Sequence, residues 1–389
     1  MADGSSPFSK SFSSLLDFSR WVAAIAVLIN HLRNPIVLGY EMIPPEDINI
    51  FITIWYLVSG LGFEAVIVFF VLSGFLVGGI SWERADKGRL VMTHYAADRF
   101  SRIFTVFVPA LFLTVILDSI GHHFFGWTGL WDVSSAQMAA RYSVPFTDNL
   151  SVAEFLGNLL MLQPFYVRYL GSNVPLWTLS FEWWFYVGFG ALIATRYFSW
   201  RVIGPLVIFL LCVALGLRFV FFFGLWLIGA FAFRVSCKSL GRPILSVFVF
   251  FLFLTASRFN STPTYPGNAI DCLIIIGIAI SFAWVVISYR EKEFRILDLS
   301  AKLNKGMADF SFSLYAFHFP IMLFLVAAIS SLFGLNEIRD GLSPASPVAV
   351  ALYMGVLMAT LLISWLFWYL TERHTGFLRV KLRSVMMKK

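Results

Sequence analysis

An acidic residue interrupts an otherwise apolar segment of this 389-residue chain. Glu182 lies inside VPLWTLSFEWWFYVGFGALI, which has the length and composition of a membrane-spanning helix. A carboxylate inside a span costs about 2.5 to 3.5 kcal/mol on insertion scales, so intramembrane acids usually serve a function and have a partner. His31, in the apolar segment SRWVAAIAVLINHLRNP, is our candidate for that partner. An imidazole beside a carboxylate is oriented and polarised as a general base.

The predicted depths of these two side chains in the membrane agree. His31 lies about 20 Å from the cytoplasmic start of its predicted span at residue 18, at 1.5 Å per residue. Glu182 lies about 10 Å from the outer end of its own predicted span at residue 175. We therefore predict that the two side chains meet in the outer half of the membrane. The alternative for His31 is an ordinary interfacial histidine near a helix end.

Three arginines lie towards the cytoplasmic ends of their predicted helices. Arg20 precedes His31 by close to three helical turns, so the two share one helix face about 16 Å apart. Arg99 and Arg102, in DRFSRIF, are one helical turn apart and project together, a spacing suited to binding phosphate. The alternative is that both arginines only set the membrane topology, which is the commoner role.

Short polar side chains also occur within the apolar segments. Ser311, Tyr315 and His318 in FSFSLYAFHFPIM share one helix face near the predicted cytoplasmic start of their span, where they either line a site or join helices. Ser73 and Gly74 in FFVLSGFL are small enough for close helix packing, and the Ser73 and Ser311 hydroxyls are weak candidates for a nucleophile that forms a covalent intermediate. The candidate site-lining residues are Ser73, Trp177, Ser311, Tyr315 and His318.

The composition identifies the elements that must position these residues. The chain is 59% hydrophobic and 13% charged, with a mean hydropathy of +0.80, whereas a soluble domain carries roughly twice that charge. We predict an all-α polytopic membrane protein with about ten transmembrane helices. They are placed at 18–38, 62–81, 103–120, 175–195, 202–217, 219–235, 243–257, 269–288, 307–333 and 347–371. The net charge of +7 lies in loops and the C-terminal tail, which indicates positive-inside topology rather than nucleic-acid binding.

The same charge pattern predicts the topology and the domain organisation. With both termini cytoplasmic, the basic loops all fall inside only if 154–170 does not span, so this segment is predicted to be re-entrant or interfacial. Trp127, Trp131 and Tyr142 lie in an outer loop and suit either the membrane interface or contact with sugar. We expect a cytoplasmic segment 1–17 without a cleavable signal peptide, a transmembrane domain 18–371 and a basic cytoplasmic tail 372–389.

Six short segments of the sequence, in this order, are similar to the landmarks of one known family. They are SRWVAAIAVLINH, FFVLSGFL, DRFSRI, VPLWTLSFEWWFY, FSFSLYAFHFP and WYLTERH. Together they resemble the acyltransferase-3 family of integral-membrane O-acyltransferases, and the resemblance covers nearly the whole chain. It implies transfer of an acetyl or succinyl group from acetyl-CoA or succinyl-CoA to a hydroxyl of a cell-surface or secreted glycan. The expected location is the inner (plasma) membrane, with multiple passes through its lipid.

The resemblance also assigns roles to the residues singled out above. His31 matches the family's catalytic base, Glu182 matches the acid of its Trp, Ser or Thr, Leu, Glu segment, and Arg20, Arg99 and Arg102 match its arginines. We expect those arginines to bind the coenzyme A phosphates, because guanidinium groups bind phosphate in a bidentate manner. No metal and no permanently bound cofactor are expected, and the sequence does not give the number of subunits.

Two other classes of function fit parts of the pattern. A proton-coupled transporter or flippase for a lipid-linked or oligomeric sugar would use Glu182 and His31 as a proton relay. A scaffold in a polysaccharide export complex would have no need of a buried acid and base. Release of free thiol from an acyl-coenzyme A distinguishes the enzyme from both.

Overall fold

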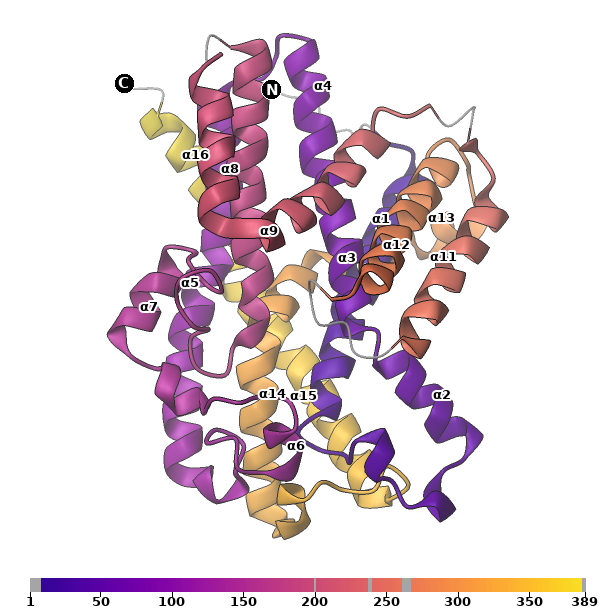
Figure 1. The fold of residues 1–389 in the computed structure, drawn as a ribbon, viewed down its shortest axis with the longest axis vertical. Coiled ribbons are helices and arrows are strands. Elements are labelled where there is room, and N and C mark those ends of the chain that lie inside the picture. Colours follow the sequence, from indigo (N-terminus) through magenta and orange to yellow (C-terminus); the bar gives the residue numbers. More distant parts are fainter. Residues whose placement is uncertain (1–7, 199–200, 237–239, 261–266, 387–389) are drawn as a thin grey trace. The chain divides into compact units, whose positions relative to one another are not determined.

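The computed structural model describes residues 8–198, 201–236, 240–260 and 267–386. These residues form helices joined by turns and loops, as predicted, with one isolated β-bridge between Val37 and Leu342 (Figure 1). The chain divides into two compact units, each assembled from three separate stretches of sequence. The first contains Met1–Ala23, Phe63–Arg99 and Phe181–Ser311, and the second contains Ala24–Gly62, Phe100–Ser180 and Phe312–Lys389.

Three long helices are divided between the units by several residues: α1 (Lys10–Arg33), α5 (Met92–Phe125) and α8 (Trp177–Tyr197). The first unit also contains α3 (Gly62–Ser73), the π-helix η3 (Gly74–Gly79), α4 (Ile80–Asp86), α9 (Ile203–Ala232), α11 (Pro243–Phe259), α12 (Ala269–Tyr289) and α13 (Arg295–Asp309). The second also contains α2 (Ile50–Ser59), α6 (Ala136–Ala139), α7 (Val152–Leu159), α14 (Ser311–Phe333), α15 (Pro347–Leu370) and α16 (Thr375–Met386). Two of these helices, α3 and α14, have only their first residue in the other unit. Short 3₁₀ helices are η1 (Tyr40–Met42), η2 (Pro45–Asp47), η4 (Gly126–Thr128), η5 (Phe146–Asn149), η6 (Val174–Leu176), η7 (Asn336–Arg339) and η8 (Glu372–His374).

Seven helical stretches among the described residues are long and apolar enough to cross a membrane. They are Lys10–Arg33, Ile50–Asp86, Met92–Thr128, Ile203–Ala232, Ala269–Tyr289, Ser311–Phe333 and Pro347–Val385. The remaining predicted spans also coincide with helix: α11 is apolar but shorter, and α8 is the 21-residue helix that contains Glu182. Length and composition thus support seven crossing helices, while the predicted number was about ten.

The first helix begins eight residues before its predicted start and ends five residues before its predicted end. Residues 10–17 are too polar for a hydropathy window to include them, yet Ser11 and Ser14 are buried by contacts within the first unit. The C-terminal end follows from Pro35, because the residue before a proline is disfavoured in helical conformation. His31 nevertheless remains inside the helix, in its last turn.

A single helix, α9, covers the two predicted spans 202–217 and 219–235. Its backbone breaks at Gly216, where φ is 73° and ψ is −171°, and Figure 1 shows the helix changing direction partway along its length. Glycine adopts such a conformation without the steric cost that a Cβ would impose. The sequence therefore located two helical segments correctly, and the structure joins them at the glycine between them.

The segment predicted to be re-entrant or interfacial, 154–170, does not form a spanning helix. It contains the end of α7, whose eight residues are far too short to cross a hydrocarbon core, followed by turns. The polar backbone of such turns needs partners at membrane depth. Asn158 supplies some of them, because its side chain bonds the backbone of Glu154, Arg168 and Leu170.

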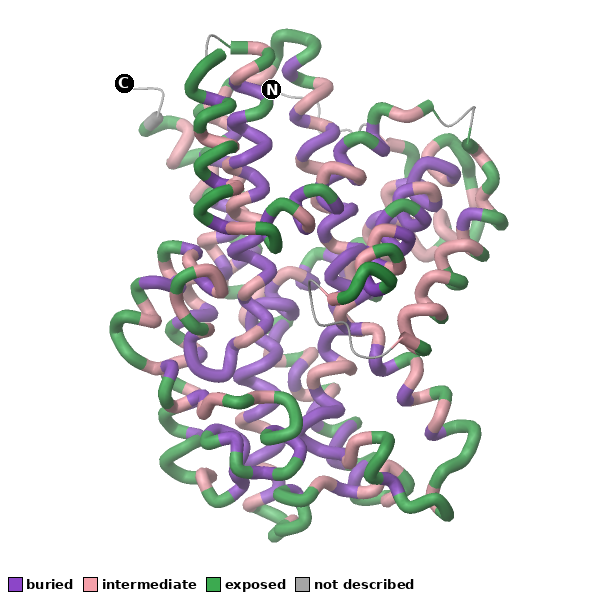
Figure 2. The backbone as a smooth tube through the Cα atoms, viewed as in Figure 1, coloured by how far each residue is buried: buried purple, intermediate pink, exposed green. Residues whose placement is uncertain are grey.

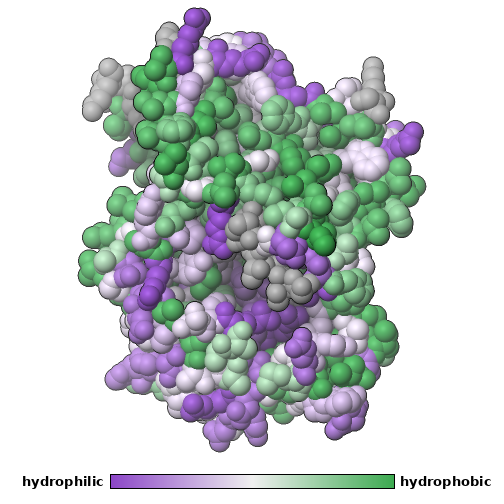
Figure 3. Space-filling view, viewed as in Figure 1, coloured by the Kyte–Doolittle hydropathy of each residue, from purple (hydrophilic) through white to green (hydrophobic). Residues whose placement is uncertain are grey.

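Burial separates the helices that form the interior from those that face outward. Most of α14 is buried, whereas the first half of α9 and much of α11 are exposed (Figure 2). The exposed side chains are apolar, and Figure 3 shows hydrophobic residues covering this part of the surface. Examples are Leu206, Phe209, Val213, Leu217, Ile244 and Phe248. Large exposed apolar surface of this kind is suited to contact with lipid.

Two glycines allow close backbone contact inside the first unit. A Cβ added at Gly229 of α9 would overlap the carbonyl oxygen of Val71 in α3, and one added at Gly74 of η3 would overlap the carbonyl oxygen of Trp226. The predicted role of the Ser73–Gly74 pair in helix packing is therefore confirmed for Gly74. Small residues at such contacts let membrane helices approach closely.

We expect Gly229→Ala to lower the free energy of unfolding by about 1 to 3 kcal/mol, the usual range for overpacking. Gly224→Ala is the matched control, because Gly224 lies on the same helix with nothing within 4 Å of its added Cβ. That control should be neutral or slightly stabilising, since alanine favours helix. Thermal unfolding of both variants in detergent measures the difference, and equal stability would contradict the close contact.

Candidate functional site

His31 is held near the C-terminal end of α1 by bonds between that end and α2. The Arg33 guanidinium donates from Nη1 to the carbonyl of Tyr56 (3.2 Å) and to Ser59 Oγ (3.0 Å), and it lies over the Tyr56 ring. Asn30 donates to the carbonyl of Ser59 at 3.0 Å. These bonds satisfy carbonyls at the end of α2 and fix the last turn of α1, from which His31 projects.

The partner of His31 in the second unit is a second histidine, His318 on α14. The Nδ1 atom of His31 lies 2.8 Å from the Nε2 atom of His318. The two ring planes are within 6° of each other and their centroids are 5.1 Å apart, as expected for coplanar imidazoles joined edge to edge. His318 is 1% exposed, whereas His31 keeps part of its surface accessible. The structure thus pairs a partly accessible histidine with a buried one.

The polar stripe on α14 divides into three different roles. His318 Nδ1 lies 2.8 Å from the carbonyl oxygen of Tyr315, one turn earlier. The Tyr315 hydroxyl donates to the carbonyl of Pro175 (3.0 Å) and accepts from Thr178 Oγ1 (2.7 Å), so Tyr315 joins helices. Ser311 donates to the carbonyl of Ala308 in the preceding turn, at 2.8 Å. Within the second unit the stripe therefore contributes His318 to His31 and Tyr315 to packing.

Aromatic side chains surround the histidine pair. The Phe319 ring lies edge-on to His31, with centroids 5.3 Å apart, and Tyr142 and Phe146 pack edge-on to Phe319. Arg141 is close enough to His31 for their charges to interact. Burial raises the pKa of Tyr142 to about 12, although Arg141 acts in the opposite direction. Tyr142 therefore remains a neutral phenol, able to donate a hydrogen bond, throughout the physiological range.

A network that sequence reasoning missed anchors the loop between α5 and α8 to α5. The buried carboxylate of Asp118 accepts from Trp131 Nε1 (2.9 Å), from the Ser172 amide (2.6 Å) and from Ser172 Oγ (2.7 Å). Asn173 donates to the carbonyl of Ala316 on α14 at 3.0 Å. Trp131 is fully buried, so the prediction that it lies at the membrane interface or contacts sugar is wrong.

Glu182 has its own set of partners inside the first unit. Ser73 Oγ and the Tyr186 hydroxyl each donate to its Oε1 at 2.6 Å, and Trp226 donates to Ser73 Oγ at 3.1 Å. Ser73 immediately precedes the π-helix η3, an element that is frequent at functional sites. The prediction named Ser73 but not Tyr186, although Tyr186 is four residues beyond Glu182 and so lies on the same helix face.

Arg99 extends this cluster in the first unit. Its guanidinium lies over the Tyr186 ring at 5.5 Å, and Tyr95, one turn before it on α5, donates to the carbonyl of Tyr186 at 2.9 Å. Nε of Arg99 is buried without a hydrogen-bond partner in the described part of the chain. A buried donor of this kind is costly to leave unpaired, so the site suits an anionic ligand.

Arg102 is engaged differently, in the second unit. Its Nη1 lies 2.6 Å from Oε1 of Glu372, and its guanidinium lies over the Phe312 ring at 4.6 Å. The other carboxylate oxygen of Glu372 accepts from the amide and the hydroxyl of Ser313. Arg102 thus takes part in a partly buried ion pair that joins α5 to the start of α14 and to η8.

The remaining predicted residues are placed as follows. Arg20 forms an ion pair with Asp17 on its own helix at 3.7 Å. Trp177 is the first residue of α8 and is partly buried. His31 and Glu182 belong to different units, and each has hydrogen-bond partners within its own unit. Their pairing stays a prediction.

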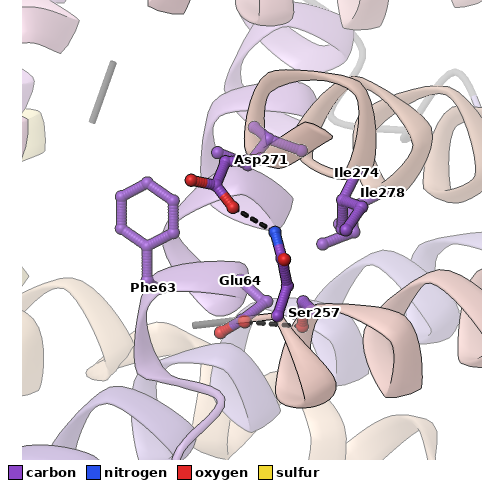
Figure 4. Close-up of a pocket in the computed structure, with 8 residues that line it drawn as sticks. Phe63, Glu64, Ser257, Asp271, Ile274 and Ile278 are labelled. Carbon is purple, nitrogen blue, oxygen red and sulfur yellow. Dashed lines mark hydrogen bonds between the residues drawn. The ribbon is translucent and has the colours of Figure 1, made fainter. Parts of the chain in front are cut away.

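A separate polar pocket in the first unit is shown in Figure 4. Ser257 donates to Glu64 Oε1 at 2.7 Å, and Asn260 donates to the carboxylate of Asp271. Glu64 Oε2 is buried without a hydrogen-bond partner among the described residues. The cavity of about 10 Å³ holds at most about one water molecule. It is therefore too small for a substrate and we assign it to packing.

Comparison with known proteins identifies the family. The acyltransferase-3 family model, described as an acyltransferase domain, matches residues 14–369. The chain belongs to this acyltransferase family. No curated protein and no solved structure matches the sequence. The protein is therefore an acyltransferase with membrane-spanning helices, and it requires an acyl donor and an acceptor. Among the described residues of this acyltransferase, no three His, Cys, Asp or Glu side chains are grouped as metal ligands.

The ion pair between Arg102 and Glu372 gives a test of stability in the acyltransferase. We expect Glu372→Ala to lower the free energy of unfolding by about 1 to 3 kcal/mol, because it leaves the buried amide and hydroxyl of Ser313 without their acceptor. Glu83→Ala is the control, since Glu83 pairs with Lys87 at the surface and such pairs contribute about 1 kcal/mol or less. Thermal unfolding in detergent compares the two variants, and similar losses would contradict the structural role.

Proposed function

We propose that this acyltransferase moves an acetyl or succinyl group from its coenzyme A thioester to a hydroxyl of a cell-surface or secreted glycan. It would act in the inner (plasma) membrane with both termini in the cytoplasm. The family and the apolar surface support acyl transfer by a membrane protein. The partly accessible His31, paired with the buried His318, is the observation that supports a general-base mechanism.

In this mechanism, Nε2 of His31 accepts the proton of the acceptor hydroxyl as the hydroxyl oxygen attacks the thioester carbonyl. The bond between the carbonyl carbon and sulfur then breaks, and the imidazolium returns the proton to the leaving thiolate. The products are the glycan ester and free coenzyme A, and no covalent enzyme intermediate is required.

Glu182 is proposed as the second catalytic residue. Both of its hydroxyl partners donate to Oε1, and Oε2 accepts no hydrogen bond from the described residues. The carboxylate is therefore fixed in position but keeps one oxygen for a positively charged group. On the proposed mechanism this group is the imidazolium formed when His31 takes up the proton, as with the acid of hydrolase triads.

Arg99 is proposed to bind a phosphate of coenzyme A. Its buried Nε lacks a partner among the described residues and its guanidinium is oriented by the Tyr186 ring, so an anion would complete its hydrogen bonding. Arg20 and Arg102 remain proposed phosphate ligands on the resemblance. Arg102 would need to combine that role with its ion pair to Glu372.

We expect His31→Ala to reduce the rate of transfer by about 10² to 10⁴, the usual contribution of a positioned base, while the protein still inserts and folds. The assay is release of free thiol from acetyl-coenzyme A and succinyl-coenzyme A by the purified protein with acceptor glycan. His123→Ala is the control, because His123 is exposed on the last turn of α5. Unchanged activity of His31→Ala would remove His31 as the base. A wild type that releases no thiol from either donor would contradict the proposed acetyl or succinyl transfer.

We expect Arg99→Gln to raise the concentration of acyl-coenzyme A that gives half the maximal rate by roughly 10-fold or more. Hydrogen bonds to charged groups contribute about 1.5 to 3 kcal/mol, and the effect should fall on the donor rather than the sugar. Arg89→Gln removes an exposed arginine from the loop before α5 and serves as the control. An equal effect of the two variants would show that Arg99 has no special role in donor binding.

A further inference from the structure

We propose that His318 is a positioning residue that sets the tautomer of His31 and so directs its basic nitrogen to the acceptor. This inference rests on the proposed function, because it assumes that His31 is the base. It is carried by a chain of hydrogen bonds within the second unit, from the Tyr315 carbonyl through His318 to His31.

The direction of each bond follows from the first acceptor. A carbonyl oxygen can only accept, so Nδ1 of His318 must carry the hydrogen that bonds Tyr315 O. His318 is 1% exposed, and burial favours the neutral imidazole, in which Nε2 is then an unprotonated acceptor. Nδ1 of His31 must therefore carry the hydrogen between the two rings. Nε2 of His31 is left unprotonated, which is the state a general base requires.

The surroundings of His318 restrict it to this arrangement. Its ring lies between those of Tyr315 and Phe319, with centroids 5.9 and 6.2 Å away. Two residues further along α14, Pro320 has no backbone N–H, so it cannot donate to the carbonyl of Ala316. Asn173 donates to that carbonyl instead at 3.0 Å. The hydrogen bond from Asn173 thus replaces the bond that Pro320 cannot make, and it stabilises the turn of α14 that carries His318.

The same series of hydrogen bonds changes the role that is proposed for Glu182. An acid that set the tautomer of His31 would have to accept from Nδ1, and that position is taken by His318. When His31 becomes an imidazolium, the lone pair of His318 Nε2 still accepts from it, and the bond becomes charge-assisted. The two residues thus have separable roles: His318 orients the neutral base, and Glu182 is left to stabilise the charged form.

Two substitutions of His318 distinguish its role as a hydrogen-bond acceptor from a role in packing alone. His318→Gln keeps a carbonyl oxygen near the position of Nε2, whereas His318→Phe keeps a ring but has no acceptor. We expect His318→Phe to lower kcat about 100-fold or more with little change in the apparent KM for acyl-coenzyme A. His318→Gln should keep activity within about 10-fold of wild type, a rescue that a role in packing alone would not produce.

The tautomer itself is measured on the wild type by ¹⁵N NMR of protein with labelled histidine in lipid nanodiscs. His31→Gln identifies the signals of His31 by their loss. We expect Nδ1 of His31 to be protonated and Nε2 to be unprotonated, and we expect the two forms to mix in His318→Phe. If His318→Phe does not fold, the spectrum of the wild type decides alone.

The possible failures are distinguishable. A wild-type His31 with Nε2 protonated and Nδ1 unprotonated would overturn the inference. A His318→Phe variant with wild-type kcat would also overturn it, provided that His31→Ala is inactive. Wild-type activity of His31→Ala would instead overturn the proposed base, whatever the tautomer. A large loss in Glu182→Gln with an unchanged His31 spectrum would support the division of roles, and a changed tautomer in that variant would contradict it.

Discussion

The hydrogen bond between two coplanar imidazoles, one from the end of α1 and one from α14, is the interaction on which the account of the second unit depends. A polar group inside a membrane must form its hydrogen bonds with other protein groups, because lipid chains offer no alternative partner. The elements around it serve that requirement. Arg33 fixes the turn that carries His31, and Asn173 restores the bonding that Pro320 removes from α14. The result is a histidine pair in which the Nδ1 atom of His31 is engaged and its Nε2 atom does not contact His318.

The first unit solves a related problem for a carboxylate. Glu182 is accommodated by two hydroxyl donors, one of them on its own helix and the other at the start of a π-helix. The close contacts at Gly74 and Gly229 bring α9 near enough for Trp226 to bond Ser73. An acid held in this way keeps its position. This arrangement answers why an apolar helix can contain it.

Hydropathy and charge in the sequence were sufficient to predict an all-helical membrane protein, and they singled out His31, Glu182 and Arg99 as candidate site residues. They could not predict the partners, because these come from residues far apart in sequence. His318 illustrates the limit: the depth arithmetic used for His31 puts it about 16 Å into its predicted span, close to the level of His31. Its stripe was nevertheless equally suited to packing, and Tyr315 on the same stripe does pack. The start of α1 and the burial of Trp131 were missed for another reason, since tertiary contacts there override hydropathy.

The central claim is that His31 presents Nε2 to the acceptor while His318 holds Nδ1. An experimental structure in lipid nanodiscs, with a non-hydrolysable acyl-coenzyme A analogue and an acceptor oligosaccharide, tests it most directly. The account predicts that His31 Nδ1 stays within hydrogen-bond distance of His318 Nε2 and that His31 Nε2 faces the acceptor hydroxyl next to the acyl carbon. Two histidines that lie apart in that complex, or a His31 ring turned so that Nε2 bonds His318, would contradict it.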